Sequence, residues 1–180
     1  MAIRILCISG SVRADSTNTW LLHAIAAHCS DLAEFAFARS DDLPIFNPDL
    51  EGDRTPPIVE RFARSVGDAD GLLLATPEYA HGVPGGLKNA LDWLVSRAEF
   101  PDKPMMMVHA SARGAHARAS LAEILRTMSG RLVSEDGLTL DLMGKSAAEL
   151  KAIFAATATR VEMRRALQAF LSQLNRPPQS

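Results

Sequence analysis

The chain has 180 residues, a formal net charge of −2 and 47% hydrophobic residues. This length suits one domain with a sizeable core, and the composition is ordinary for a globular protein. The small negative charge argues against a nucleic-acid partner, because proteins that bind nucleic acids usually carry a strong basic excess. No apolar run approaches the length of a membrane span, so we expect no membrane partner either.

The cysteine content argues against disulfide and metal chemistry. Cys7 and Cys29 are too few for a disulfide scaffold or a four-ligand metal site, and no Cys-x-x-Cys motif occurs. Cys7 lies in an apolar run and is expected to be a small core residue, whereas Cys29 follows a helix and is a candidate surface thiol. Because the N-terminus shows no signal-type segment, we expect a reduced, cytoplasmic setting.

The hydrophobic pattern predicts strands and helices that alternate along the chain. Strands are expected within residues 3–8, 32–38, 71–75, 105–108 and 132–142. Helices are expected over residues 20–27, 58–66, 87–94 and 121–128, and a long one over 147–174. The long helix follows a capping-box pattern at Ser146 and Glu149. Its apolar stripe changes face near 161–163, which indicates either a break or burial on two sides, and residues 176–180 are expected to be a frayed tail.

This alternation predicts an α/β fold, a doubly wound five-stranded parallel sheet with helices on both faces and right-handed crossovers. In such sheets, ligands bind at the carboxyl ends of the strands, where the winding reverses. A strand order of 2-1-3-4-5 would place the turns after the first, third and fourth strands on one rim. No linker or repeat is visible, so residues 1–180 are expected to form a single domain.

The turn at residues 10–18 joins the first strand to the first helix and is rich in hydrogen-bond donors. Those donors are Ser11, Arg13, Ser16, Thr17 and Asn18. Together with the helix N-terminus, they suit a phosphate dianion. The alternative is that Ser16 or Asn18 is only a helix cap and Arg13 only a solvated charge. The turn is neither a Gly-x-Gly-x-x-Gly motif nor a Walker lysine loop, which argues against a dinucleotide across it and against ATP.

The turn at residues 76–86 is dense in proline and glycine, so its backbone is expected to keep one shape. Such a turn suits the wall of a site for a planar ring, with Tyr79 as an aromatic surface or simply as a half-buried packing residue. Glu78 is interpreted as a brace that accepts N–H bonds rather than as a general acid or base. His81 is either a proton donor at the rim or a solvated loop histidine.

The turn at residues 111–118 closes the third side of the expected site. Gly114 permits close approach of a ligand to the backbone. Arg113 and Arg118 could bind the phosphates of a second, transient nucleotide, or each could be an ordinary surface charge. For Arg118, which lies near a helix start, we favour the surface charge.

Two motifs give the chain a family resemblance. They are Gly10-Ser11-x-Arg13-x-x-Ser16-x-Asn18 and Pro77-Glu78-Tyr79-x-x-x-x-Pro84-Gly85-x-Leu87-Lys88-Asn89-Ala90-x-Asp92-Trp93. With them the chain resembles the NADPH-dependent FMN reductases of the flavodoxin-like fold, a group that includes quinone, azo-dye and chromate reductases. The order and spacing of elements agree with that family from residue 1 to about residue 142.

The resemblance implies that the donors of the first turn hold the FMN phosphate. It implies that the isoalloxazine lies between the second and third turns. The residues implied there are Pro77, Glu78, Tyr79, Ala80, Ser111, Arg113 and Gly114. It also implies a homodimer or homotetramer, with the helix after the second turn near the interface. The chain departs from the commoner pattern at Ala80, where asparagine is usual, and at Gly82, where serine or threonine is usual.

The implied activity is that of an FMN-dependent NAD(P)H oxidoreductase. Hydride would pass from NADPH or NADH to the flavin and on to a quinone, an azo compound, a metal oxyanion or free flavin. No side chain has to act as an acid or base, and Tyr79 and His81 are candidates only for protonating a quinone-like acceptor. The alternatives are a non-enzymatic FMN electron carrier and a flavin-free regulatory protein on the same fold.

Overall fold

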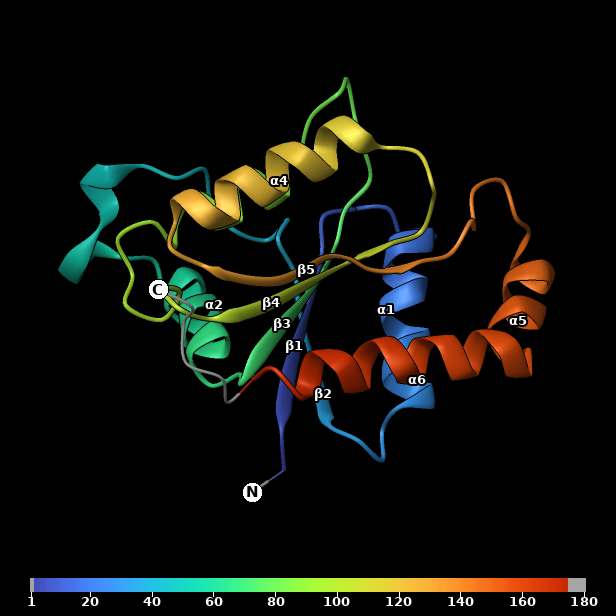
Figure 1. Cartoon of the computed structure of the whole chain (residues 1–180). Coiled ribbons are helices and arrows are strands. Elements are labelled where there is room, and N and C mark those ends of the chain that lie inside the picture. Colours follow the sequence, from blue (N-terminus) through green and yellow to red (C-terminus); the bar gives the residue numbers. More distant parts are fainter. Residues whose placement is uncertain (1, 175–180) are drawn as a thin grey trace.

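The computed structural model describes residues 2–174 and consists of one parallel sheet between two layers of helices (Figure 1). The strands are β1 (Arg4–Ser9), β2 (Glu34–Ala38), β3 (Gly71–Ala75), β4 (Pro104–His109) and β5 (Arg131–Thr139). Their order is β2-β1-β3-β4-β5 and every neighbouring pair is parallel, which confirms the predicted topology. The tail predicted at residues 176–180 lies outside the described residues.

Three helices cover each face of the sheet, and a separate apolar cluster fills each side. The helices are α1 (Thr17–His28), α2 (Pro57–Gly67), α3 (Gly85–Asp92), α4 (Ala115–Thr127), α5 (Ala147–Ala155) and α6 (Thr157–Leu171). Helices α2, α3 and α4 pack on one face, and α1, α5 and α6 pack on the other. Within residues 2–174, no helix has both the length and the apolar character needed to cross a membrane.

The long C-terminal helix is broken, as one of the two interpretations of its apolar stripe allowed. Ala156 has φ of −62° and ψ of 134°, an extended conformation that separates α5 from α6. The capping box of Ser146 and Glu149 at the start of α5 is confirmed. The break at Ala156 comes several residues before the stripe changes face. Beyond it, Met163 of α6 is buried against the sheet.

The prediction of a surface thiol at Cys29 is wrong, because that side chain is fully buried at the end of α1. Helix α6 covers this end: Arg164 donates to the backbone oxygen of His28 at 3.2 Å and pairs with Asp31 at 2.7 Å. Burial raises the pKa of the Cys29 thiol, and it raises the pKa of Cys7 to about 12. Cys7 is a core residue, as expected.

The long loop between β2 and α2 is held against α3 by hydrogen bonds. The Nε1–H of Trp93 donates to the backbone oxygen of Pro44 at 2.7 Å. Asn89 Oδ1 accepts the backbone N–H of Phe46 at 2.7 Å. Because Asn89 and Trp93 carry these contacts, two residues of the second motif serve first to fix this loop, which also contains two short 3₁₀ turns at Pro48–Leu50 and Gly52–Arg54.

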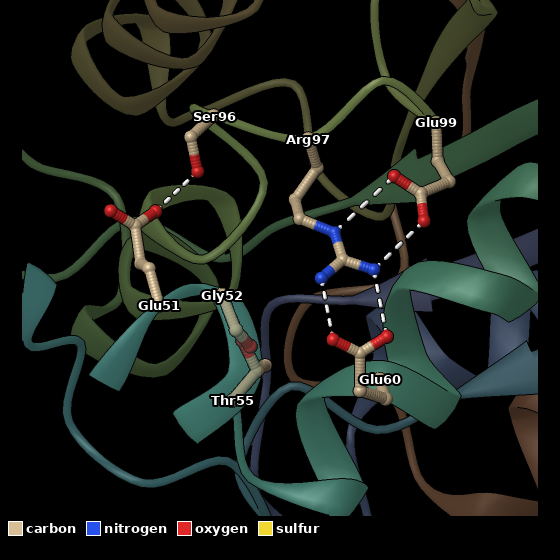
Figure 2. Close-up of polar contacts among 7 residues, drawn as sticks. All are labelled: Glu51, Gly52, Thr55, Glu60, Ser96, Arg97 and Glu99. Carbon is tan, nitrogen blue, oxygen red and sulfur yellow. Dashed lines mark hydrogen bonds and ion pairs between the residues drawn. The ribbon is translucent and has the colours of Figure 1, made fainter.

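A polar network joins α2 to the segment that follows α3 (Figure 2). The guanidinium of Arg97 binds both carboxylate oxygens of Glu60, at 2.7 and 2.9 Å, and Glu99 at 2.9 Å. Ser96 donates to Glu51 of the long loop in the same region. The hydrogen bonds from Arg97 lower the pKa values of the Glu60 and Glu99 carboxyls.

We expect the Arg97→Gln variant to melt at a lower temperature than wild type, with a pH-dependent difference. The folded-state pKa values of Glu60 and Glu99 lie below their ordinary value of 4.5. Their ion pairs therefore stabilise the protein fully above that value and stop doing so as acid protonates the folded carboxyls. Thermal melts should show the gap shrinking as the pH falls from about 5 through the lowered pKa values of the two carboxyls.

The control is Arg61→Gln, which changes an exposed arginine of α2 outside this network. It should show no comparable pH-dependent gap. A gap for Arg97→Gln that stays constant across this range would contradict the assigned role of the network.

Candidate functional site

The turns after β1, β3 and β4 meet at one rim of the sheet and line a cavity of about 620 Å³. That volume lies within the usual range for small-molecule sites. The predicted residues that line it are Ser11, Arg13, Ser16, Thr17, Asn18, Pro77, Glu78, Tyr79, Ser111, Arg113 and Gly114. A groove of about 710 Å³ lies elsewhere, between β5 and α6. We take the cavity at the strand ends as the site because the three donor-rich turns converge on it.

The first and second turns lie side by side because Gly10 has no side chain. Its N–H donates to the backbone oxygen of Ala75 at 2.8 Å, which extends the pairing of β1 with β3 beyond the strand ends. A Cβ at Gly10 would lie 2.7 Å from Thr76 Oγ1 and 2.9 Å from a methyl carbon of Leu87. A larger residue would therefore push the two turns apart.

The N-terminus of α1 opens into the cavity without a side-chain cap. Ser16 occupies the N-cap position, but its hydroxyl makes no capping hydrogen bond. Ser16 and Asn18 are 5% and 7% exposed, and both line the cavity. The first backbone N–H groups of a helix have no partner within it, so this end favours an anion. Arg13 is exposed beside it and forms no ion pair with any residue in the described part of the chain.

Tyr79 begins a tight two-residue turn in the second loop. Tyr79 and Gly82 exchange backbone hydrogen bonds at 2.9 and 3.2 Å, and between them Ala80 and His81 have φ of 49° and 60°. Positive φ at both central positions is the pattern of a type I′ turn, for which asparagine and glycine are best suited. The usual asparagine at position 80 thus has a conformational reason. Ala80 does not line the cavity, so its contact with a ligand stays a prediction.

Glu78 braces the second turn against the third. Its Oε2 accepts the backbone N–H of Ala117, in the first turn of α4, at 2.8 Å. A Cβ at Gly114 would lie only 3.5 Å from Glu78 Cβ, so the two turns approach closely here. The interpretation of Glu78 as a brace that accepts N–H bonds is confirmed. Half of the Tyr79 surface is exposed beside it, on the wall of the cavity.

The third turn is shorter than predicted, because α4 already begins at Ala115. Gly114 has φ of 95° and is the N-cap residue of that helix. Interpreting Arg118 as an ordinary surface charge is wrong: its guanidinium donates to the backbone oxygens of Ser111 and, at 3.1 Å, of Arg113. Outside the cavity, the ring of His81 stacks on that of His116 of α4, with centroids 4.3 Å apart.

Sequence reasoning missed part of the cavity wall. The additional lining residues are Asp15, Thr76, His109, Ala110, Arg118, Met143, Gly144 and Lys145. The last three belong to the loop after β5. Their place on the cavity wall follows from the topology once the limits of that strand are known. His109, the last residue of β4, is buried with Nε2 2.6 Å from the backbone oxygen of Glu135, and burial lowers its pKa. Residues 2–174 contain no cluster of three or more metal-ligating side chains.

We expect Ala80→Asn to raise the free energy of unfolding by about 1 kcal/mol, because asparagine tolerates the left-handed conformation better than alanine. Ala80→Val should lower it by more than that, since β-branched residues are strongly disfavoured at positive φ. Chemical denaturation of the three proteins without ligand measures both effects. Equal stability of all three would contradict the turn geometry.

Comparison with known proteins agrees with the fold. The family model described as NADPH-dependent FMN reductase matches residues 3–142. The 2-hydroxy-1,4-benzoquinone reductase of a Burkholderia species is 43% identical over 93 residues, which cover 52% of this chain and 50% of that protein. The NADH:(hydroxy)cinnamate reductase subunit CrdA of Vibrio ruber is 33% identical over 149 residues, which cover 79% of this chain and 72% of that protein.

Among solved structures, the flavoenzyme NAD(P)H:(acceptor) oxidoreductase FerB from Paracoccus denitrificans superposes with a TM-score of 0.77 at 25% identity. That likeness covers 96% of this chain and 97% of FerB. The chain spans about half the length of the Burkholderia protein and of a probable NADPH:quinone oxidoreductase 2 of Oryza sativa. Since the family model covers most of the chain and includes the turns after β1, β3 and β4, the chain belongs to the NADPH-dependent FMN reductase family.

Proposed function

We propose that the protein is an FMN-dependent NAD(P)H oxidoreductase that reduces a small-molecule acceptor, with a quinone as the preferred class. The observation that supports this most is the uncapped N-terminus of α1, which opens among the donors of the first turn into the cavity at the sheet rim. That arrangement suits a ligand with a phosphate at one end and a planar ring at the other.

The residues present fit FMN. Arg13, which forms no ion pair within residues 2–174, could bind a terminal phosphate with two parallel hydrogen bonds, and Ser16 and Thr17 line the same cavity. The distance from this end to the second and third turns is spanned by one continuous cavity. A ring between Tyr79 and Gly114 would meet an aromatic side chain on one wall and backbone on the other.

When bound, FMN supplies the hydride transfer between a nicotinamide and the acceptor. The chain binds and orients it: the first turn holds the phosphate, and the second and third turns fix the ring plane. Glu78 keeps these two turns together through Ala117. Tyr79, half exposed on the cavity wall, is the candidate donor of the proton that a quinone takes up together with the hydride.

A quinone is the preferred acceptor because a relative with 43% identity is named 2-hydroxy-1,4-benzoquinone reductase. Azo compounds, metal oxyanions and free flavin are further candidates that the cavity does not distinguish. The rates of flavin reduction by NADPH and by NADH would measure which nucleotide the protein prefers. We also propose a homodimer or homotetramer and a cytoplasmic location.

The phosphate assignment predicts that FMN binds at least about tenfold more tightly than riboflavin, which lacks the phosphate. Flavin fluorescence titration of the apoprotein measures both dissociation constants. Arg13→Ala should weaken FMN binding and leave riboflavin binding nearly unchanged. Arg61→Ala, at an exposed position on α2, should change neither. Equal affinities of the wild type for both flavins would contradict the proposal.

The flavin-loaded protein should oxidise NADPH or NADH when benzoquinone is present, at a rate that rises with quinone concentration. Stopped-flow absorbance of the flavin band, followed under nitrogen, separates the reduction step from the reoxidation step. A non-enzymatic electron carrier would bind FMN yet show almost no reduction by either nucleotide. A flavin-free regulatory protein would stay colourless after incubation with FMN.

A further inference from the structure

Arg118 lies in the first turn of α4, and its side chain reaches back to the turn that precedes the helix. We propose that Arg118 is a positioning residue that fixes the direction of two peptide units in the 111–114 turn and so presents backbone N–H groups to the flavin. This inference rests on the proposed function, since the flavin is the ligand it serves.

The guanidinium of Arg118 contacts two carbonyls and one carboxylate. One terminal nitrogen, Nη2, donates to the backbone oxygens of Ser111 and Arg113. The other, Nη1, lies 3.7 Å from Asp136 Oδ1 on β5. The side chain is 21% exposed, so water competes little for these donors. A planar guanidinium holds several acceptors in fixed directions, which a lysine ammonium does not.

Each carbonyl that Arg118 holds fixes an N–H group on the same peptide plane. In a trans peptide, the C=O of one residue and the N–H of the next point in opposite directions. Binding the oxygen of Ser111 therefore turns the N–H of Ala112 away from the guanidinium, and binding that of Arg113 does the same for Gly114. Within residues 2–174, neither N–H group donates to a protein atom.

The remaining N–H group of this turn is already used. The backbone N–H of Arg113 donates to Ser111 Oγ at 3.0 Å, so the turn carries its own internal constraint. Of Ala112 and Gly114, only the second lines the cavity, so the N–H of Gly114 is the donor proposed for the ring. It lies at the N-terminus of α4, where the helix dipole strengthens binding of an electron-rich atom. By donating hydrogen bonds to the backbone oxygens of Ser111 and Arg113, Arg118 thus determines which N–H groups the third turn offers to a ring.

The chain offers a matched control on the same helix. Arg126 lies two turns further along α4 and pairs with Glu135 of β5, next to the carboxylate that faces Arg118. It neither contacts the 111–114 turn nor lines the cavity. Arg126→Gln therefore removes a comparable charge and ion pair without touching the proposed mechanism.

The test compares wild type with Arg118→Gln, Arg118→Lys and Arg126→Gln. Hydrogen exchange of the apoprotein is measured over residues 110–118, and the FMN dissociation constant is measured by fluorescence. We expect Arg118→Gln to speed exchange in this segment and to raise the FMN dissociation constant roughly tenfold. Arg118→Lys should give intermediate values, and Arg126→Gln should behave as wild type in both measurements.

Wild-type exchange and wild-type FMN affinity in Arg118→Gln would overturn the inference. So would faster exchange in Arg118→Gln with unchanged FMN affinity, which would mark a purely structural contact. If Arg118→Gln does not fold, Arg118→Lys decides by the same two criteria. If wild type binds no FMN, the proposed function and this inference both fail, and the exchange data then show whether Arg118 orders the turn for another purpose.

Discussion

The parallel pairing of β1 with β3 is the constraint on which the rest of the site depends. It places the ends of two strands that are more than sixty residues apart in sequence at the same level, with Ser9 beside Ala75. This alignment brings Gly10 against the second turn and places the N-terminus of α1 beside Pro77. Because β1 and β3 are almost wholly buried between two apolar clusters, a one-residue shift in register would exchange the side chains that face each cluster, so the geometry of the rim is tied to the packing of the core.

A second level of order comes from polar contacts between the turns. Glu78 joins the second turn to α4, and Arg118 holds the carbonyls of the third turn. Both sets of contacts are between protein groups, so they join the two walls to the helix and to each other. Binding to walls that are already fixed costs less conformational entropy than binding to mobile loops.

Local sequence patterns were sufficient for most of the fold. The run at Gly71–Ala75 is apolar throughout and is buried at every position, and the donors of the first turn lie within nine residues. The strand order followed from the general behaviour of alternating βα units. What was missed depends on contacts that no local pattern marks. Arg118 looks like a surface charge in sequence, although its acceptors, the backbone oxygens of Ser111 and Arg113, lie only seven and five residues earlier, because its side chain folds back on the turn.

The limits of β5 and the break before α6 have a similar origin. The pairing of β4 with β5 shifts register twice around Met106, so no simple alternation marks the strand. Without its limits, the loop at 143–145 could not be placed on the cavity wall. The burial of Cys29 likewise depends on Arg164, more than a hundred residues away.

The burial of the Cys7 and Cys29 thiols has a consequence for a protein proposed to carry out redox chemistry. Oxidants attack the thiolate form of cysteine, and burial keeps both thiols protonated and out of reach. Met143 is half exposed on the cavity wall, so an oxidant formed at the rim would meet its sulfur atom. Oxidation would then begin at the Met143 thioether and leave the folded core intact. Its product, methionine sulfoxide, is one that sulfoxide reductases reverse.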